Sequence, residues 1–391
     1  MSRPSLGLFT YSTAPRGSVV HAAFLAEAMT ELGWDVTLYA LDKDGGRFFR
    51  DVRAKVRLVP AAAAPTTTAE LVKQRAEELA RYVRDVAPKH DVHHAEDCLT
   101  ANGLLAARDA GVRLSVVRTV HHVEKFTDPY LAACQERSIR RAALCLAVSR
   151  TAELDVERGF GVRCARVSNG VSVARFARRD EARIVALRAR YGLGDEPVVL
   201  AVGGVEPRKN TLCTLRAFVR VLRREPTARL VVAGGATVLD HGEYRARYEA
   251  ELAALPAAVR ARVYETGVLA DDDVPSFFHL ARALCFPSVE EGFGLVALEA
   301  LAAGLPVVTS AVPPLTEFLD DSVAALVDPH SDEAVATAVL RAFDAPSAQL
   351  EAGRVRATSY SWERVARLHA DAYQAVMSAP APRRTSLEST A

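Results

Sequence analysis

Short apolar segments that alternate with amphipathic ones are the feature that most constrains the fold of this chain. The apolar segments have the length of buried β-strands, and the segments between them show helical periodicity. Strands that alternate with helices form parallel sheets with helices on both faces. Two successive sets of six or seven strands therefore predict an α/β fold with two doubly wound domains. The expected strands are LGLFT, DVTLYA, VRLVP, DVHHA, LSVVRTV, LCLAVS and RVSNG in the first set, and PVVLAVG, RLVVAGG, RVYETG, LCFPS, PVVTS and AALVDP in the second.

The expected helices carry start and stop signals. The segment HAAFLAEAMTELG ends at a glycine, and residues 68–87 place their apolar residues on one face. Thr67 and Glu70 have the spacing of a capping box ahead of that helix. We therefore expect helices between the strands throughout both halves.

The chain divides at a polar, Arg-rich segment near residues 170–195, which ends in Gly and Pro. We expect a first domain at 1–172 and a second at 173–360. A patterned final helix follows at 361–378. Residues 379–391 are rich in Pro, Ser and Thr without an apolar period, which predicts a disordered tail.

Composition excludes several classes of function. The 391 residues hold 49 Lys and Arg against 48 Asp and Glu, a net charge of +1 that gives no support to nucleic-acid binding. The six cysteines form no CxxC pair, which favours free thiols in a reducing compartment. The chain lacks a signal-peptide core and an apolar run of about 18 residues, so we expect a cytoplasmic protein. Peripheral contact with a membrane stays open, as does the oligomeric state.

Charged residues follow the strand at 198–202, where open α/β sheets bind their ligands. The segment VVLAVGGVEPRKN presents Gly203 and Gly204, and then Arg208, Lys209 and Asn210. An arginine fork beside a lysine point charge suits a diphosphate. A solvated basic helix start is the alternative interpretation.

A second strand is followed by CFPSVEEGFGLVALEA, which has glutamates at 291 and 299. The turn EGFG lets backbone N–H groups and a helix N-terminus face an anion. Glu299 lies within an apolar helix, where a carboxylate without a partner is costly. Ribose hydroxyls would satisfy it, and a specific internal partner would do so equally.

Together these motifs resemble those of glycosyltransferase family 4. The match comprises E-x7-E at Glu291 and Glu299, the segments VGGVEPRKN, LVDP and NGVSVARF, and YSWERVA near the C-terminus. The GxGxxG signature of dinucleotide-binding enzymes is absent. The resemblance implies the GT-B fold, in which two Rossmann-like domains face a cleft. Residues 1–172 would supply the acceptor side and 173–360 the nucleotide-sugar side, and 361–378 would cross back onto the first domain.

The family resemblance also implies roles for individual residues. The enzyme would be a hexosyl-type transferase that moves a sugar from a nucleoside-diphosphate sugar to an acceptor hydroxyl, or another nucleophile, with retention of anomeric configuration. Arg208 and Lys209 would hold the leaving diphosphate, Glu291 the sugar hydroxyls, and His121, in a T-x-H pattern, the transferred sugar. The implied donor-binding residues are Gly17, Gly204, Asn210, Gly267, Val268, Gly292, Phe293, Gly294, Leu295 and Glu299. The acceptor stays open among small molecules, glycans and lipid-linked sugars.

Several residues keep more than one interpretation. His21, His93, His94 and His122 would contact ligand or serve only in packing. The runs Asp271-Asp272-Asp273 and Asp42-Lys43-Asp44 match a metal-binding D-x-D formally, but they are typical of a helix N-cap and a turn. We therefore expect no metal and no other cofactor. A GT-B-fold sugar-nucleotide epimerase and a non-catalytic sugar-nucleotide-binding protein are the alternative functions.

Overall fold

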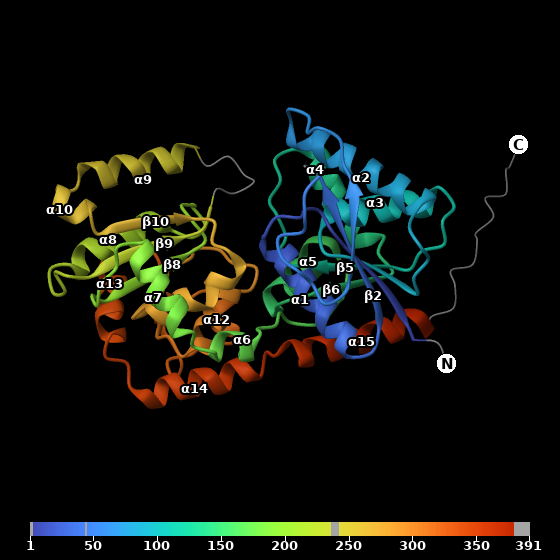
Figure 1. Cartoon of the computed structure of the whole chain (residues 1–391). Coiled ribbons are helices and arrows are strands. Elements are labelled where there is room, and N and C mark those ends of the chain that lie inside the picture. Colours follow the sequence, from blue (N-terminus) through green and yellow to red (C-terminus); the bar gives the residue numbers. More distant parts are fainter. Residues whose placement is uncertain (1–2, 44, 236–241, 379–391) are drawn as a thin grey trace, which may run out of the picture.

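The computed structural model describes residues 3–43, 45–235 and 242–378, which form two lobes that each contain a parallel sheet (Figure 1). The first sheet has the order β3-β2-β1-β4-β5-β6-β7 and the second β10-β9-β8-β11-β12-β13. The predicted α/β fold with two doubly wound sheets is confirmed. The predicted disordered tail lies outside the described residues. The strands are β1 Ser5–Thr10, β2 Asp35–Asp42, β3 Lys55–Pro60, β4 Val92–Ala95, β5 Val116–Val120, β6 Leu144–Ala147, β7 Cys164–Arg166, β8 Val198–Val202, β9 Arg229–Ala233, β10 Val263–Gly267, β11 Ala283–Phe286, β12 Val307–Ser310 and β13 Ala325–Val327.

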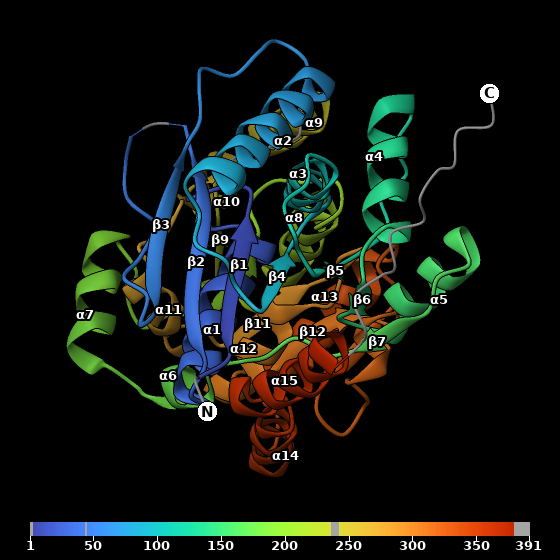
Figure 2. The ribbon, with the colours of Figure 1, turned by 90° about the vertical axis from the view of Figure 1, so that its right-hand side faces the viewer.

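Helices cover both faces of each sheet. Figure 2 shows α2 and α3 on one side of the first sheet and α1 and α15 on the other. In the second lobe, α7, α11 and α12 pack on one face, and α8 and α13 on the other. The helices are α1 Gly17–Glu31, α2 Thr68–Asp85, α3 Cys98–Asp109, α4 Pro129–Arg140, α5 Arg150–Phe160, α6 Val173–Ala177, α7 Glu181–Arg190, α8 Thr211–Val221, α9 Gly242–Ala254, α10 Ala257–Arg260, α11 Val274–Leu280, α12 Leu295–Ala303, α13 Asp332–Ala342, α14 Ser347–Thr358 and α15 Trp362–Ser378, with 3₁₀ turns η1 Asp271–Asp273 and η2 Leu315–Glu317.

Two local predictions need correction. The strand expected at RVSNG is β7, which already ends at Arg166, because Ser168 takes a left-handed φ of 65° and turns the chain out of the sheet. The backbone N–H of Glu70 donates to the Thr67 hydroxyl, as a capping box requires. The Glu70 carboxylate, however, accepts from that same hydroxyl at 2.8 Å, where a capping box would have it accept from the Thr67 backbone.

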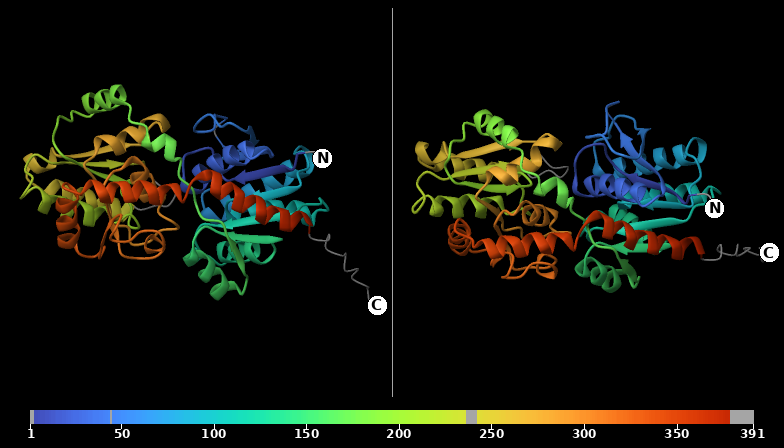
Figure 3. Two further views of the ribbon diagram at one scale, coloured as in Figure 1. Left: turned by 90° about the horizontal axis from the view of Figure 1, so that it is seen from below. Right: turned by 60° about the horizontal axis from the view of Figure 1, so that its bottom comes forward.

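The chain passes between the lobes twice, and the two passages lie side by side. Val171 donates its N–H to the carbonyl of Tyr360 at 2.8 Å, and it forms an isolated β-bridge with Ser361. A Cβ on Gly170 would lie 2.6 Å from the indole of Trp362, so glycine is required there. From Trp362 onward, α15 packs against the first lobe, as Figure 3 shows from below.

The connecting segment is shorter than the polar stretch 170–195 suggests. Val167 belongs to the apolar core of the first lobe, and Val171 already belongs to that of the second. Ile184 and Leu187 of α7 are buried in the same second core. Rotation between the lobes would therefore be confined to a few residues around 168–170 and around Ser361.

A carboxylate of the second lobe also forms hydrogen bonds with the N-terminus of a helix of the first lobe, a contact that we call the clasp. Glu317, in η2, accepts hydrogen bonds from the backbone N–H groups of Arg150 and Thr151, both at 2.7 Å, and from the Thr151 hydroxyl at 2.6 Å. The first N–H groups of a helix have no partner within the helix and carry its positive dipole end. Glu317 therefore links the lobes by capping α5.

This clasp should stabilise the closed arrangement of the lobes. Glu317→Ala removes all three bonds; at an exposed position this costs about 1 kcal/mol, or about a fivefold shift between open and closed forms. We expect small-angle scattering to show a larger radius of gyration for this variant than for the wild type. Glu153→Ala, which removes a carboxylate of α5 that pairs within its own lobe, serves as the control. Equal radii in all three proteins would contradict the proposed clasp.

Candidate active site

Two loops that are distant in sequence meet at the carboxyl ends of β8 and β11, which are neighbours in the second sheet. Lys209 Nζ lies 2.7 Å from Glu291 Oε1, and Arg208 Nη1 lies 3.1 Å from Glu291 Oε2. The backbone N–H of Val289 donates to the Arg208 carbonyl at 3.0 Å and holds the loops together. Three of the four residues predicted to carry the chemistry, all but His121, thus form one ion-paired triad.

Two members of the triad lie mostly out of solvent, whereas the side chain of Arg208 is 42% exposed. The side chains of Glu291 and Lys209 are 6% and 12% exposed. Burial would raise the pKa of Glu291, but the charges of Lys209 and Arg208 hold it below its ordinary value. Burial lowers the pKa of Lys209, which also lies 4.5 Å from the centre of the Phe286 ring. A second carboxylate, Glu206, lies 3.7 Å from Arg208 Nη2, so the two cations face two carboxylates. Arg208 and Lys209 have more N–H donors than these contacts use, and the remaining donors can bind an anion.

Glycines make room for this arrangement. Gly203 has φ 121°, and a Cβ there would lie 2.8 Å from Lys209 Cε. Gly204 has φ 76°, and its Cβ would lie 2.8 Å from the carbonyl oxygen of Gly235. Gly234 and Gly235 were not singled out from the sequence. The signal was present, because RLVVAGG ends its strand with the same glycine pair as VVLAVGG.

Asn210 ties the site loops to one another. It has a left-handed φ of 56° at the start of α8. Its amide nitrogen donates to the carbonyls of Pro287 at 3.2 Å and Pro329 at 2.6 Å. Because protein carbonyls accept from both N–H groups of its amide, the side chain positions the loops. Its predicted contact with the sugar nucleotide stays a prediction.

The EGFG turn brings the two lobes into contact. A Cβ on Gly292 would lie 2.8 Å from the carbonyl oxygen of His121, so backbone of the second lobe touches backbone of the first. Gly294, with φ 101°, precedes α12 without any side-chain cap, and of the first three N–H groups of the helix only that of Ala297 donates, to the Gly294 carbonyl, which leaves those of Leu295 and Val296 available. The ring of Phe293 stacks on Phe318 with centroids 4.9 Å apart. Phe293 and Leu295 would therefore meet a ligand through their backbone.

Glu299 lies on α12, partly exposed, and has no hydrogen bond or ion pair to any described residue. Burial raises its pKa to about 7, and Arg175 acts against this effect. Arg175 was missed from the sequence because its segment was interpreted as a linker. A carboxylate without a protein partner at this position is available to a ligand.

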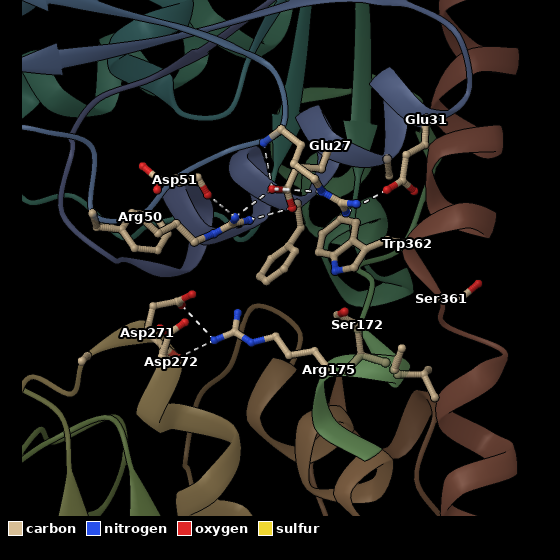
Figure 4. Close-up of a pocket in the computed structure, with 18 residues that line it drawn as sticks. Glu27, Glu31, Arg50, Asp51, Ser172, Arg175, Asp271, Asp272, Ser361 and Trp362 are labelled. Atoms are coloured by element: carbon tan, nitrogen blue, oxygen red, sulfur yellow. Dashed lines mark hydrogen bonds and ion pairs between the residues drawn. The ribbon is translucent and has the colours of Figure 1, made fainter. Parts of the chain in front are cut away.

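A cavity of about 790 Å³ lies between the lobes, and its lining includes Arg175 and Asp271, whose charges act on Glu299. Figure 4 shows the Glu27–Arg50 pair of the first lobe above it and Arg175 with Asp271 below, while Trp362 closes one side. The triad itself does not line this cavity. Glu299 does not line it either, so the cavity is separate from both predicted carboxylates.

The remaining residues predicted to bind the sugar nucleotide have open space or solvent beside them. Gly267 ends β10 with φ 66°, and no atom lies within 4 Å of the position of its Cβ. The side chain of Val268 is 68% exposed, and Gly235 makes room for its methyl group. Gly17 begins α1 in the first lobe, and it also has nothing within 4 Å of its Cβ position.

His121 follows β5, and its side chain turns toward the first lobe, where its Nε2 lies 2.9 Å from Glu96 Oε2. His21 and His94 surround the same carboxylate, so they share its site. His93 is buried elsewhere, with its ring near Phe9 and His90. His122 is exposed and pairs with Glu124 at 2.5 Å. Sequence reasoning missed Glu96, although a charged residue directly after a strand was its signal.

The aspartate run at 271–273 is neutralised by arginines. Asp271 lies 3.0 Å from Arg175, and Asp273 lies 2.8 Å from Arg183. The N-cap interpretation is confirmed, because Asp273 is the N-cap residue of α11 and a proline stands in the first turn, although the Asp273 carboxylate makes no capping bond. Asp44 lies outside the described residues. Within the described ranges, only His21, Glu96 and His121 place three metal-ligand atoms within 4.8 Å of one another. Among the described helices, none has the length and apolarity needed to cross a membrane.

The raised pKa of Glu299 predicts a stability cost that depends on pH. In the folded chain the carboxyl holds its proton up to about pH 7, against an ordinary pKa of 4.5, so its burial costs stability as pH rises through this window. Glu299→Gln should therefore raise the melting temperature by about 2–4 °C at pH 8 and by much less at pH 4.5. Glu157→Gln, at an exposed glutamate of α5, is the control. A gain of equal size at both pH values would contradict the assignment.

Comparison with known proteins agrees with this geometry. Family models match residues 15–175, as "Glycosyltransferase Family 4", and residues 186–356, as "Glycosyl transferases group 1". The D-inositol 3-phosphate glycosyltransferase of Salinispora arenicola is 32% identical over 77% of this chain and 72% of its own length. Sucrose-phosphate synthase from Thermosynechococcus elongatus has a similar structure, with a TM-score of 0.78 at 21% identity over 97% of this chain and all of that one. Anabaena HepE, solved with UDP and glucose, gives a TM-score of 0.74 at 16% identity over 96% and 99% of the two chains. The chain belongs to glycosyltransferase family 4.

Proposed function

We propose that this glycosyltransferase takes a hexosyl group from a nucleoside-diphosphate sugar and transfers it with retention of anomeric configuration. The observation that carries the proposal is the Arg208–Glu291–Lys209 triad, which stands where the second lobe touches the backbone of His121. In this assignment the diphosphate binds Arg208, Lys209 and the N–H groups at the start of α12. Glu291 orients the sugar hydroxyls and Glu299 accepts from the ribose.

The geometry favours a front-face reaction. The bond between the anomeric carbon and the diphosphate oxygen breaks, and the two cations stabilise the charge that collects on the leaving oxygen. The acceptor oxygen attacks from the same face, and its proton passes to the departing phosphate. Both oxygens of Glu291 already hold cations, at 2.7 and 3.1 Å, so this carboxylate is not a free nucleophile for double displacement.

A solved structural neighbour supports the choice of the first donor class to test. Because the similar Anabaena protein was solved with UDP and glucose, a uridine diphosphate sugar is the first donor to test. Thermal-shift screening against uridine, guanosine, adenosine and thymidine diphosphate sugars would identify the base, since ligand binding stabilises the folded state. The acceptor is a small molecule, a glycan or a lipid-linked sugar.

Removing either cation of the triad should slow transfer strongly. We expect Arg208→Ala and Lys209→Ala each to lower turnover about 10²–10³-fold, the loss typical of removing one group that stabilises an oxyanion. Arg216→Ala, on α8 and paired with Glu251, is the matched control and should keep normal turnover. Circular dichroism should accompany the assay, because Lys209→Ala leaves part of the buried charge of Glu291 unpaired. Near-normal turnover in both folded variants would contradict the diphosphate site.

Transfer should not require a divalent cation, because Arg208 and Lys209 supply the charge that a metal would otherwise provide at the diphosphate. We expect the purified enzyme to keep its activity after EDTA treatment and dialysis. Loss of activity that is restored by Mg²⁺ or Mn²⁺ would contradict this proposal, and the aspartate run at 271–273 would then be a candidate metal site.

A further inference from the structure

A buried carboxylate stands directly behind His121. Glu96 follows β4, and its side chain is 0% exposed. Its Oε2 lies 2.9 Å from His121 Nε2 and 3.0 Å from His21 Nδ1. The three residues come from the end of β5, the loop after β4 and helix α1, so the fold of the first lobe brings them together.

The position of Glu96 is fixed from several sides. Its backbone N–H donates to the carbonyl of Phe9 at 3.0 Å, and its own carbonyl accepts from Arg118 Nη1 at 3.0 Å. His94 also lies near Glu96, and its two ring nitrogens each lie 2.6 Å from a hydroxyl, Nε2 from that of Thr119 and Nδ1 from that of Tyr373. Tyr373 belongs to α15, so the helix that returns from the second lobe completes this buried polar cluster.

The charge states of the pair determine which nitrogen of His121 carries the proton. Burial would raise the pKa of Glu96, but the histidines around it hold that pKa well below its ordinary value. Burial lowers the pKa of His121 to about 4 despite the neighbouring carboxylate, so the imidazole is neutral at pH 7. An ionised carboxylate can only accept, and hence Nε2 carries the proton. The other titratable or charged groups around the pair are His21, His94, His369, Arg118 and Tyr373.

The second ring nitrogen of His121 is then a hydrogen-bond acceptor. The ring is 16% exposed, and Nδ1 has no hydrogen-bond partner among the described residues. The carbonyl of the same residue lies against Gly292, next to Glu291 of the triad. An acceptor nitrogen at this place can accept a hydrogen bond from a sugar hydroxyl, whereas a protonated Nδ1 could not accept that hydrogen bond.

We infer that Glu96 is a positioning residue for sugar transfer: its buried carboxylate, 2.9 Å from His121 Nε2, fixes the tautomer that aims an unprotonated Nδ1 at a substrate hydroxyl. This inference rests on the proposed function, in which His121 contacts the transferred sugar. Glu96 itself touches no substrate and acts through His121 alone. The same three groups would otherwise suit a metal ion, because His21, Glu96 and His121 present ligand atoms within 4.8 Å of one another.

The tautomer can be measured directly, without any substrate. In protein labelled with ¹⁵N-histidine, His121→Gln identifies the resonances of His121, and the nitrogen shifts then show which atom is protonated. We expect a proton on Nε2 in the wild type, and a mixed or Nδ1-protonated ring in Glu96→Gln. Glu124→Gln, which removes the carboxylate from the exposed His122 pair, is the matched control and should leave the His121 signals unchanged. A wild-type ring protonated on Nδ1 would overturn the inference whatever the enzyme transfers.

Kinetics then separate positioning from folding and from donor binding. Glu96→Gln should lower kcat about 10–100-fold, the loss typical of removing an outer partner that orients a ligand-contacting histidine. Calorimetry should show an unchanged Kd for UDP, since the donor groups lie on the second lobe. Glu96→Asp, which keeps the charge but shortens the reach, should lose less than Glu96→Gln. Normal turnover in Glu96→Gln would overturn the inference. So would one equivalent of zinc in the purified wild type that disappears in Glu96→Gln. Failure of UDP and of the other diphosphates to bind the wild type would instead count against the proposed function.

Discussion

Lys209 and Arg208 both reach the carboxylate of Glu291, and the remainder of the site depends on that contact. Two adjacent cations would repel each other in a dry environment, and a buried carboxylate without a partner would be costly. Together they are stable, and the N–H donors of Arg208 and Lys209 that these contacts leave unused can bind an anionic ligand. The arrangement requires Gly203 to leave room for the lysine stem, and it requires β8 and β11 to be neighbours. The catalytic proposal is therefore a consequence of sheet order and of one ion-paired cluster.

The second requirement is contact between the lobes, because the triad and His121 lie on different sheets. Gly292 approaches the His121 carbonyl so closely that a side chain would not fit, and Glu317 caps α5 across the same division. The two chain passages at Val171 and Ser361 form a single narrow connection beside these contacts. Closure of the lobes can thus assemble the reacting groups and exclude water, whereas opening can admit the donor and release the product.

Much of the fold and part of the site were predictable from the sequence, for physical reasons. The central strands, such as β8 and β11, bury both faces, so their apolar runs are continuous and easy to find, and the charged loops that follow them stand out. The partners that could not be predicted depend on tertiary contacts. The role of Glu96 can be recognised only from its contacts with His121 and His21. The role of Arg175 can be recognised only from its electrostatic effect on Glu299. No periodicity or local motif encodes such pairs, because they form only when the sheets fold.

The central claim is that the triad of the second lobe holds the diphosphate of the donor. A crystal structure of the chain with UDP, or with the diphosphate that the screen selects, tests this most directly. The account predicts phosphate oxygens within hydrogen-bond distance of Lys209 Nζ and the Arg208 guanidinium, with a ribose hydroxyl on Glu299. A diphosphate bound away from both cations, at the His21–Glu96–His121 cluster or among the arginines of the cavity in Figure 4, would contradict it.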